Sequence, residues 1–250
     1  AGRRRFMAVA TEPGAGRKHP SAPALIRMGL KRWASVRTLR ATFARRERLR
    51  GKKKLGARQV IFLRERKKPF SIYMQWLDGP GKNRRIAYIE GRNNGKFEAT
   101  AGGALGWIVR NMAPDDPAVF KTSRHTILEA GLGVLMRKID KQFRAAGRYA
   151  RSKYKGKVDF HGRTCHKFYR YVPQRPGRYC WKLEVLIDEE LGFPLYVKFW
   201  DWQGEAFEEY SYTDIELNPG YTDKDFHVKA VPRKQRRPRR AGSNVRSTGT

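Results

Sequence analysis

The amino-acid sequence predicts an α+β protein in which a strongly curved antiparallel sheet, an incomplete β-barrel, carries helices on its concave side. Apolar and polar residues alternate along most of the chain, which is the hydrophobic period of strands with one buried face. Two segments replace this alternation with a helical period. The expected order is therefore a helix, five or so strands, a second helix and five or so further strands.

The first half begins with a short amphipathic helix, expected over residues 25–36, where apolar side chains recur at helical spacing between charged positions. The alternating segments that follow are expected to pair in antiparallel order, because Gly-rich and Asp-rich turns separate them. These strands are predicted at residues 39–44, 58–66, 69–77, 84–90, 95–100 and 106–110.

The second half begins with a longer helix, expected over residues 126–149, in which one stripe of Ile, Leu and Phe faces the sheet. Strands are then predicted at 155–161 and 163–172, and a meander of three strands at 179–187, 193–202 and 205–213 completes the sheet. One face of this meander is apolar and must be covered. Its cover is either the second helix or a bound apolar molecule.

The net charge of +32 comes mainly from the two ends of the chain. Residues 1–68 contain 22 Lys and Arg against three acidic residues, and residues 229–250 contain eight against none. Residues 69–228 are close to balance, with 25 basic and 20 acidic residues. Such basic ends either attract nucleic acid, anionic envelope polymers and anionic membrane surfaces, or remain as solvated extensions.

Composition divides the chain into one domain and two extensions. Residues 1–22, rich in Gly, Pro and Arg, are predicted to be a disordered basic segment, and residues 229–250 a disordered Arg-rich tail. Residues 23–228 are expected to form a single domain, and no apolar run approaches the roughly 18 residues that span a bilayer. No signal peptide is evident, because the apolar run after the first arginines is shorter than the about seven to fifteen residues required.

No residue pattern supports catalysis, and we expect a protein that is not an enzyme. The sequence lacks Gly-x-Ser-x-Gly, His-Glu-x-x-His and a phosphate-binding Gly-rich loop, and acidic pairs such as Glu208-Glu209 are expected at the surface. Cys165-His166 followed by Cys180 lacks the spacing of a zinc site, so no metal or cofactor is expected.

The two cysteines are expected to be free thiols. If a four-residue loop at 173–176 closes the hairpin, Cys165 lies opposite Glu184 and about 13 Å from Cys180, which is too far for a disulfide. Another loop length brings the two sulfurs closer together.

The sheet also carries more large aromatic residues than a sheet of this size usually needs. Core packing against the second helix is the simpler explanation, and the alternative is the wall of a ligand cavity. The residues in question are Trp76, Trp181, Trp200, Trp202, Phe193 and Phe199.

Several segments resemble a bacterial family known only as domain of unknown function 1571. The resemblance covers about residues 36–226, and its motifs are structural rather than catalytic. In chain order, the segments that carry it are 64–76, 88–93, 131–133, 162–165, 187–188 with 193–195, 209–214 with Asn218, and 225–226.

That family is similar to the periplasmic lipoprotein carriers and sensors of the LolA, LolB and RseB type, in which an incomplete antiparallel barrel lidded by helices holds acyl chains. The resemblance implies a LolA-like domain in the periplasm or cell envelope that binds a lipid, a lipoprotein acyl chain or another apolar ligand without catalysis. The alternative is a module that binds nucleic acid or an anionic envelope surface through its basic ends. The expected pocket wall consists of Phe70, Ile72, Met74, Trp76, Trp181, Leu183, Val185, Phe193, Leu195, Val197 and Phe199.

Overall fold

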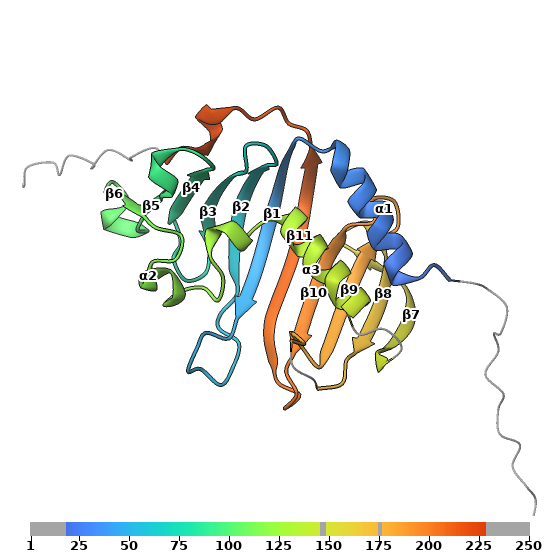
Figure 1. Cartoon of the computed structure of the whole chain (residues 1–250). Helices are drawn as coiled ribbons and strands as arrows, with labels where there is room; N and C mark the ends of the chain where they lie inside the picture. Colours follow the sequence, from blue (N-terminus) through green and yellow to red (C-terminus); the bar gives the residue numbers. More distant parts are fainter. Residues whose placement is uncertain (1–18, 146–148, 175–176, 229–250) are drawn as a thin grey trace, which may run out of the picture.

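The structure, a computed structural model, describes residues 19–145, 149–174 and 177–228 (Figure 1). The predicted Arg-rich tail at 229–250 lies outside the described residues, as does all but the last part of the segment 1–22. In that last part, Ser21 accepts a hydrogen bond from the backbone N–H of Ala24 (3.3 Å) and caps the first helix. No helix of the described ranges is long and apolar enough to cross a membrane.

One antiparallel sheet of eleven strands forms the body of the molecule, in the order β6-β5-β4-β3-β2-β1-β11-β10-β9-β8-β7. The first six strands build one half of the sheet, the last five build the other, and β1 pairs with β11 where the halves meet. The strands are β1 (Thr38–Glu47), β2 (Gln59–Arg66), β3 (Ser71–Asp78), β4 (Arg85–Ile89), β5 (Phe97–Thr100), β6 (Val109–Met112), β7 (Arg151–Phe160), β8 (Arg163–Tyr171), β9 (Lys182–Asp188), β10 (Pro194–Trp200) and β11 (Ala206–Leu217).

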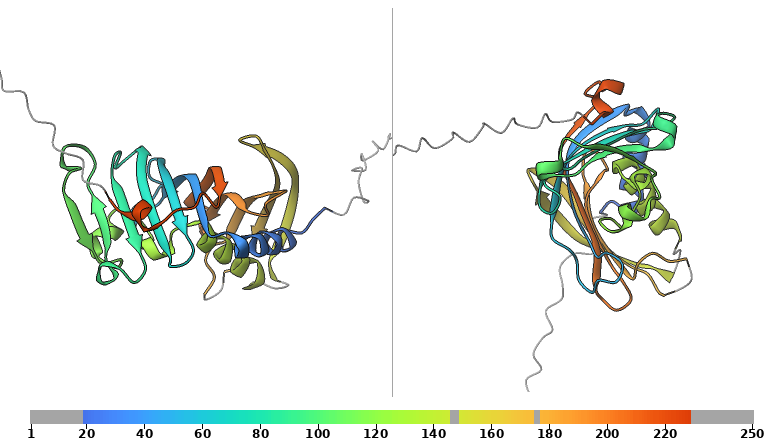
Figure 2. Two further views of the ribbon diagram at one scale, coloured as in Figure 1. Left: turned by 90° about the horizontal axis from the view of Figure 1, so that it is seen from above. Right: turned by 90° about the vertical axis from the view of Figure 1, so that its left-hand side faces the viewer.

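The sheet is strongly curved and open, with β6 and β7 as its two edges, and the helices lie on its concave side (Figure 2). This confirms the predicted α+β architecture of an incomplete barrel. The strand predictions are also confirmed, since each of the eleven segments forms a strand whose ends shift by at most four residues. The helices are α1 (Ala22–Ser35), α2 (Pro117–Phe120) and α3 (Leu132–Ala145), with 3-10 turns at Asn93–Gly95, Gly103–Leu105, Ile127–Glu129 and Asp223–Phe226.

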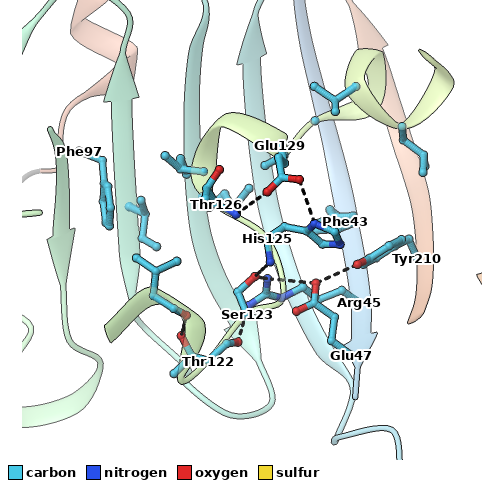
Figure 3. A pocket seen from close by; sticks show the side chains of 18 of the residues that line it. Phe43, Arg45, Glu47, Phe97, Thr122, Ser123, His125, Thr126, Glu129 and Tyr210 are labelled. Carbon is cyan, nitrogen blue, oxygen red and sulfur yellow. Dashed lines mark hydrogen bonds and ion pairs between the residues drawn. The ribbon is translucent and has the colours of Figure 1, made fainter. Parts of the chain in front are cut away.

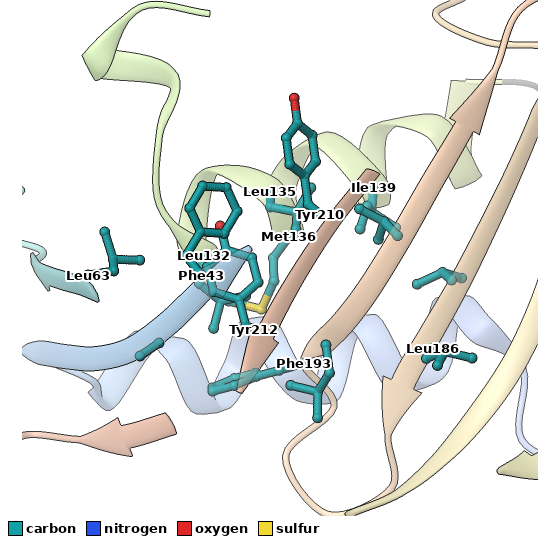
Figure 4. Packing of buried hydrophobic residues seen from close by; sticks show 14 of the residues in the cluster. Phe43, Leu63, Leu132, Leu135, Met136, Ile139, Leu186, Phe193, Tyr210 and Tyr212 are labelled. Carbon is teal, nitrogen blue, oxygen red and sulfur yellow. The ribbon is translucent and has the colours of Figure 1, made fainter. Parts of the chain in front are cut away.

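Helices α1 and α3 pack against the concave face of the second half of the sheet, and the main hydrophobic core runs from there into the first half (Figure 4). Met136 and Ile139 of α3 are fully buried there, together with Phe193. The α1 backbone also approaches the turn between β9 and β10 closely, because a Cβ atom on Gly29 would stand 2.2 Å from the carbonyl oxygen of Gly192. This half of the concave face is therefore tightly packed.

The chain after β11 runs across the end of the first half of the sheet (Figure 1), and its last described residues contact the convex face. Phe226 and Val228 pack there in a small second cluster with Tyr73, Ala87 and Ile89. Outward-facing side chains of β3 and β4 are thus buried as well, although the alternation of the sequence gives no sign of a second cover.

The predicted second helix begins six residues too early. Its first residues form a 3-10 turn in which the side chains of Thr126 and Glu129 make a reciprocal capping box. Gly131 then adopts a φ of +103°, a conformation that favours glycine, and α3 starts only at Leu132. Residues 146–148 of the predicted helix lie outside the described residues.

The predicted register between β8 and β9 is wrong by four residues, since Cys165 lies opposite Asp188 rather than Glu184. The reason is the connection, which runs from the end of β8 at Tyr171 to the start of β9 at Lys182 and is much longer than the assumed loop. The expectation of free thiols is confirmed: both cysteines are buried and unbonded. Burial raises the pKa of each thiol to about 12, so neither forms a reactive thiolate at neutral pH.

Candidate ligand cavity

A cavity of about 930 Å³ lies on the concave side of the first half of the sheet, beside the tightly packed half. Strands β1, β3, β4, β5, β6 and β11 form its floor, and α3 with the segment 118–131 forms its cover (Figure 3). This volume is near the upper end of the range of about 300–1,000 Å³ that is common for ligand pockets. The space is therefore large enough for a ligand with one or more apolar chains.

Most of the cavity wall is apolar. Strand alternation explains the wall, because residues two apart on one strand face the same side of the sheet. The apolar residues of the wall come from five strands and from the cover, and include Phe43, Met74, Trp76, Ile86, Phe97, Ala99, Met112, Val119, Ile127, Val134 and Leu135.

Two arginines flank the indole of Trp76 in the cavity wall. The guanidinium carbons of Arg45 and Arg84 lie 5.6 and 5.5 Å from the ring centroid, which is within the range of cation–π attraction. The indole N–H of Trp76 donates to the Gln59 side chain at 3.2 Å. The side chain of Trp76 is thus fixed on three sides.

Arg45 connects the sheet to the cover of the cavity. Its guanidinium donates hydrogen bonds to the Ser123 hydroxyl (3.1 Å) and to the Thr122 carbonyl (3.2 Å) (Figure 3). A third hydrogen bond goes to the Gln59 side chain (2.7 Å). It also forms an ion pair with Glu47 at 3.6 Å. The donors of this side chain are therefore committed to the protein itself.

Glu208 of β11 is the centre of a buried polar network beside the cavity. Its carboxylate pairs with Arg124 at 3.0 Å, with His125 at 2.9 Å and with Lys138 at 3.4 Å, and it accepts a short hydrogen bond from the hydroxyl of Tyr179. Glu208 has no exposed surface, so the expectation that both acids of the Glu208-Glu209 pair lie at the surface is wrong. Because side chains alternate between the two faces of β11, Glu208 lies on the concave face of the sheet.

The network fixes the charges of its members. Burial alone raises the pKa of Glu208, but the hydrogen bond from His125 and the charge of Lys138 outweigh burial and lower it to about 2. Burial lowers the pKa of His125, yet its hydrogen bond to Glu208 and the charge of that carboxylate raise the pKa above the ordinary value. Glu208 is thus ionised, and protonation of His125 is favoured.

A second buried carboxylate, Glu47 of β1, holds the same part of the cover. It accepts a hydrogen bond from the hydroxyl of Tyr210 at 2.9 Å (Figure 3). It accepts another from the backbone N–H of Arg124, also at 2.9 Å. Together, Glu47 and Glu208 attach the segment around His125 to the two central strands of the sheet.

Glu65 of β2 lies at the N-terminus of α3. Its carboxylate accepts a hydrogen bond from the backbone N–H of Leu132 at 2.9 Å, where the helix dipole favours negative charge. Burial nevertheless raises the pKa of Glu65 to about 7, although the backbone N–H groups of Leu132 and Gly133 act in the opposite direction. The start of α3, and with it one wall of the cavity, is therefore held by a carboxyl group that titrates near neutrality.

The residues predicted for the pocket wall separate into three groups. Met74 and Trp76 line the cavity. Phe70 is half-buried beside Tyr88, and Trp181 is 36% exposed, edge-on to Tyr171. The others lie fully buried in the hydrophobic core, and these are Ile72, Leu183, Val185, Phe193, Leu195, Val197 and Phe199.

Several cavity residues were missed by the sequence analysis. The alternation of β1 and β5 could have indicated Phe43 and Phe97, because these strands were identified. Nothing in the sequence pattern could have indicated His125 or Arg84, since their positions depend on the cover and on the turn between β3 and β4. Within the described ranges, no group of three or more His, Cys, Asp or Glu could hold a metal ion.

Three solved structures illustrate the similarity of this chain to known proteins. The MucA/MucB complex of Pseudomonas aeruginosa has a TM-score of 0.49 and 13% identity, over 84% of this chain and 61% of that one. The lipoprotein LppX of Mycobacterium tuberculosis has a TM-score of 0.47 and 10% identity, over 80% and 97% of the two chains. A LolA superfamily protein of Nitrosomonas europaea has a TM-score of 0.33 and 8% identity, over 84% and 98%.

Sequence comparisons assign the chain to a protein family. No curated protein matches the chain. The family model described as protein of unknown function (DUF1571) matches residues 36–233, which span the whole sheet and the helix α3. The chain therefore belongs to the DUF1571 family.

Proposed function

We propose that this protein is a non-enzymatic binder or carrier that holds the apolar part of a lipid, of a lipoprotein or of another apolar ligand in the cavity between its sheet and α3. The single observation that carries the proposal is the cavity of about 930 Å³ with its mainly apolar wall. The resemblance of the sequence to LolA-like carriers also implies a location in the periplasm or cell envelope. Fractionation of the source cells tests this location.

The physical support comes from the contrast between the two halves of the concave face. Protein interiors are normally close-packed, with few voids larger than a water molecule. One half follows this rule, because α1 and α3 fill it with side chains such as Met136 and Phe193. The other half leaves apolar side chains of five strands facing an unfilled space, where they forgo van der Waals contacts that a bound chain would supply.

Trp76 provides a direct test, because it lines the cavity whereas Trp181 lies away from it. Binding of the fluorescent fatty acid cis-parinaric acid is expected to quench tryptophan emission. A Trp76→Phe variant should lose most of this quenching, and the matched control Trp181→Phe should keep it. Equal loss in both variants would contradict binding in the cavity.

Native mass spectrometry and lipid extraction of the purified protein test the same proposal without a probe. A co-purified amphiphile is the expected result. The absence of any bound amphiphile, together with no quenching by the fatty acid, would remove the proposal.

A further inference from the structure

The wall of the cavity is mostly apolar, but the charged residues that line it are mainly Lys and Arg. Among the residues that the structure describes, two carboxylates line it, and both already have partners. Glu47 accepts from Tyr210 and pairs with Arg45, and Glu129 accepts from the Thr126 backbone (3.0 Å) and lies 3.3 Å from His125. The basic residues that line it are Arg45, Arg84, Arg110, Arg137, Lys138, Lys141 and Arg178.

Arg84 stands out among these cations. It is half-buried, it lies against Trp76, and its side chain makes one hydrogen bond within the described residues, a long one of 3.4 Å to the Thr122 hydroxyl. It forms no ion pair with any carboxylate that the structure describes, although a guanidinium offers five N–H donors. Burial and the charge of Arg45 lower its pKa.

Two further cations of α3 face the same space. Arg137 and Lys141 are exposed, line the cavity and stand one helical turn apart, a spacing at which like charges repel. Neither forms an ion pair with a described carboxylate. Lys138 between them differs, because Glu208 neutralises it.

A half-buried cation without a counter-ion is unfavourable, since it loses hydration and gains no charge partner. A planar guanidinium is also the side chain best suited to bind a carboxylate or a phosphate with two parallel hydrogen bonds. A ligand with an anionic group would therefore satisfy both Arg84 and the positive charge of α3.

We infer that the ligand of this cavity is an anionic amphiphile, whose carboxylate or phosphate pairs with Arg84 while its apolar chain lies along Met74, Phe97 and Met112. This inference rests on the proposed function and adds the chemical class of the ligand. Arg137 and Lys141 contribute long-range attraction at the cavity, and Arg84 makes the direct contact.

The test uses ligands that share one chain and differ in the polar group: dodecanoate, dodecyl phosphate, dodecanol and dodecyltrimethylammonium. Each is added to the full-length protein carrying the neutral fluorescent probe N-phenyl-1-naphthylamine, and the concentration that displaces half of the probe is measured. The two anions are expected to act at about tenfold lower concentration than the alcohol, and the cation at the highest concentration.

Arg84→Gln is expected to remove most of this tenfold preference and to leave displacement by dodecanol unchanged, so the alcohol also reports that the variant is folded. Arg84→Lys should keep part of the preference, because the charge remains but the planar fork is lost. Lys82→Gln is the matched control in the same turn and should behave like the natural protein, since Lys82 is exposed.

The outcomes separate the inference from the proposed function. If the probe does not bind and no amphiphile competes, the proposed function fails. If the probe binds but alcohol and anions are equally potent, or if Arg84→Gln keeps the preference, the inference is overturned and the proposed function stands. If acetate or inorganic phosphate displaces the probe as well as the dodecyl compounds do, the site takes a small anion, and the inference is overturned too.

Discussion

Replacement of Glu208 by Gln tests the buried network that holds the cover of the cavity. The substitution keeps the size of the side chain and removes its charge, so that Arg124 and Lys138 lose the carboxylate that neutralises them. Glu208 has no exposed surface, and only 29% and 24% of the Arg124 and Lys138 side chains are exposed, so water replaces the lost carboxylate only in part. The variant should therefore be clearly less stable at neutral pH.

The magnitude follows from the pKa of Glu208, which lies at about 2 instead of 4.5. Since one pKa unit corresponds to about 1.4 kcal/mol, ionised Glu208 contributes about 3 kcal/mol to the free energy of unfolding. The cost of breaking a buried ion pair, about 3–5 kcal/mol, agrees with this value. For a chain of this size the loss corresponds to a fall in Tm of about 6–12 °C.

The sign of the pH dependence is also fixed. A carboxyl group whose pKa is lowered on folding contributes fully above its unfolded pKa of 4.5, and its contribution is lost as the pH falls towards 2. Urea unfolding of the natural protein and of Glu208→Gln should thus differ by about 3 kcal/mol at pH 7, and the difference should shrink below pH 4.5.

Glu216→Gln is the matched control on the same strand. Glu216 pairs with Arg40 at 2.6 Å, but about half of both side chains is exposed, so the loss should stay below about 1 kcal/mol. A Glu208→Gln difference that stays constant from pH 7 to pH 3 would refute the reasoning, because it would show that shape rather than charge matters at this position.

Three further predictions concern other parts of the chain. The pKa of Glu65 is raised from 4.5 to about 7, so the natural protein should lose stability as the pH rises from 4.5 to 7. Above pH 7, Glu65→Gln should therefore be more stable than the natural protein by about 3 kcal/mol in urea unfolding. Parallel pH curves of the two proteins would contradict this. Gly29→Ala should destabilise by about 1–3 kcal/mol in thermal unfolding, because the new Cβ meets the backbone of Gly192, whereas Lys31→Ala at an exposed position of α1 should not. If the Arg-rich tail docks the protein on nucleic acid or an anionic envelope polymer, deletion of residues 230–250 should weaken that binding and flatten its salt dependence, and unchanged binding would exclude the tail.

The alternation of apolar residues was sufficient to predict the strands and their faces. Trp76 and Phe199 were both assigned to the inward side, and both are buried there. Alternation is a local signal that depends only on the pleat of each strand. It could not show which element covers each residue, so it could not separate Trp76 in the cavity wall from Phe199 in the core.

The polar network could not be predicted, because its partners are far apart in the sequence. Arg124 and Lys138 precede Glu208 by 84 and 70 residues, and they reach it only because the cover folds back over β11. From the sequence alone, an acid next to another acid on a strand is most simply placed in water. Burial of Glu208 is favourable only when three cations and a tyrosine hydroxyl surround it.

The length of α3 explains why a cavity exists at all. Eleven strands at about 4.8 Å spacing span about 48 Å, whereas a helix of 14 residues is about 21 Å long and covers about four of these spacings. The helix predicted from residue 126 would have extended about 9 Å further over the sheet. Instead, the capping box of Thr126 and Glu129 and the positive φ of Gly131 end the regular structure there. An irregular segment held by Arg45, Glu47 and Glu208 covers the first half of the sheet, and beneath it the space that a longer helix would have filled stays open to a ligand.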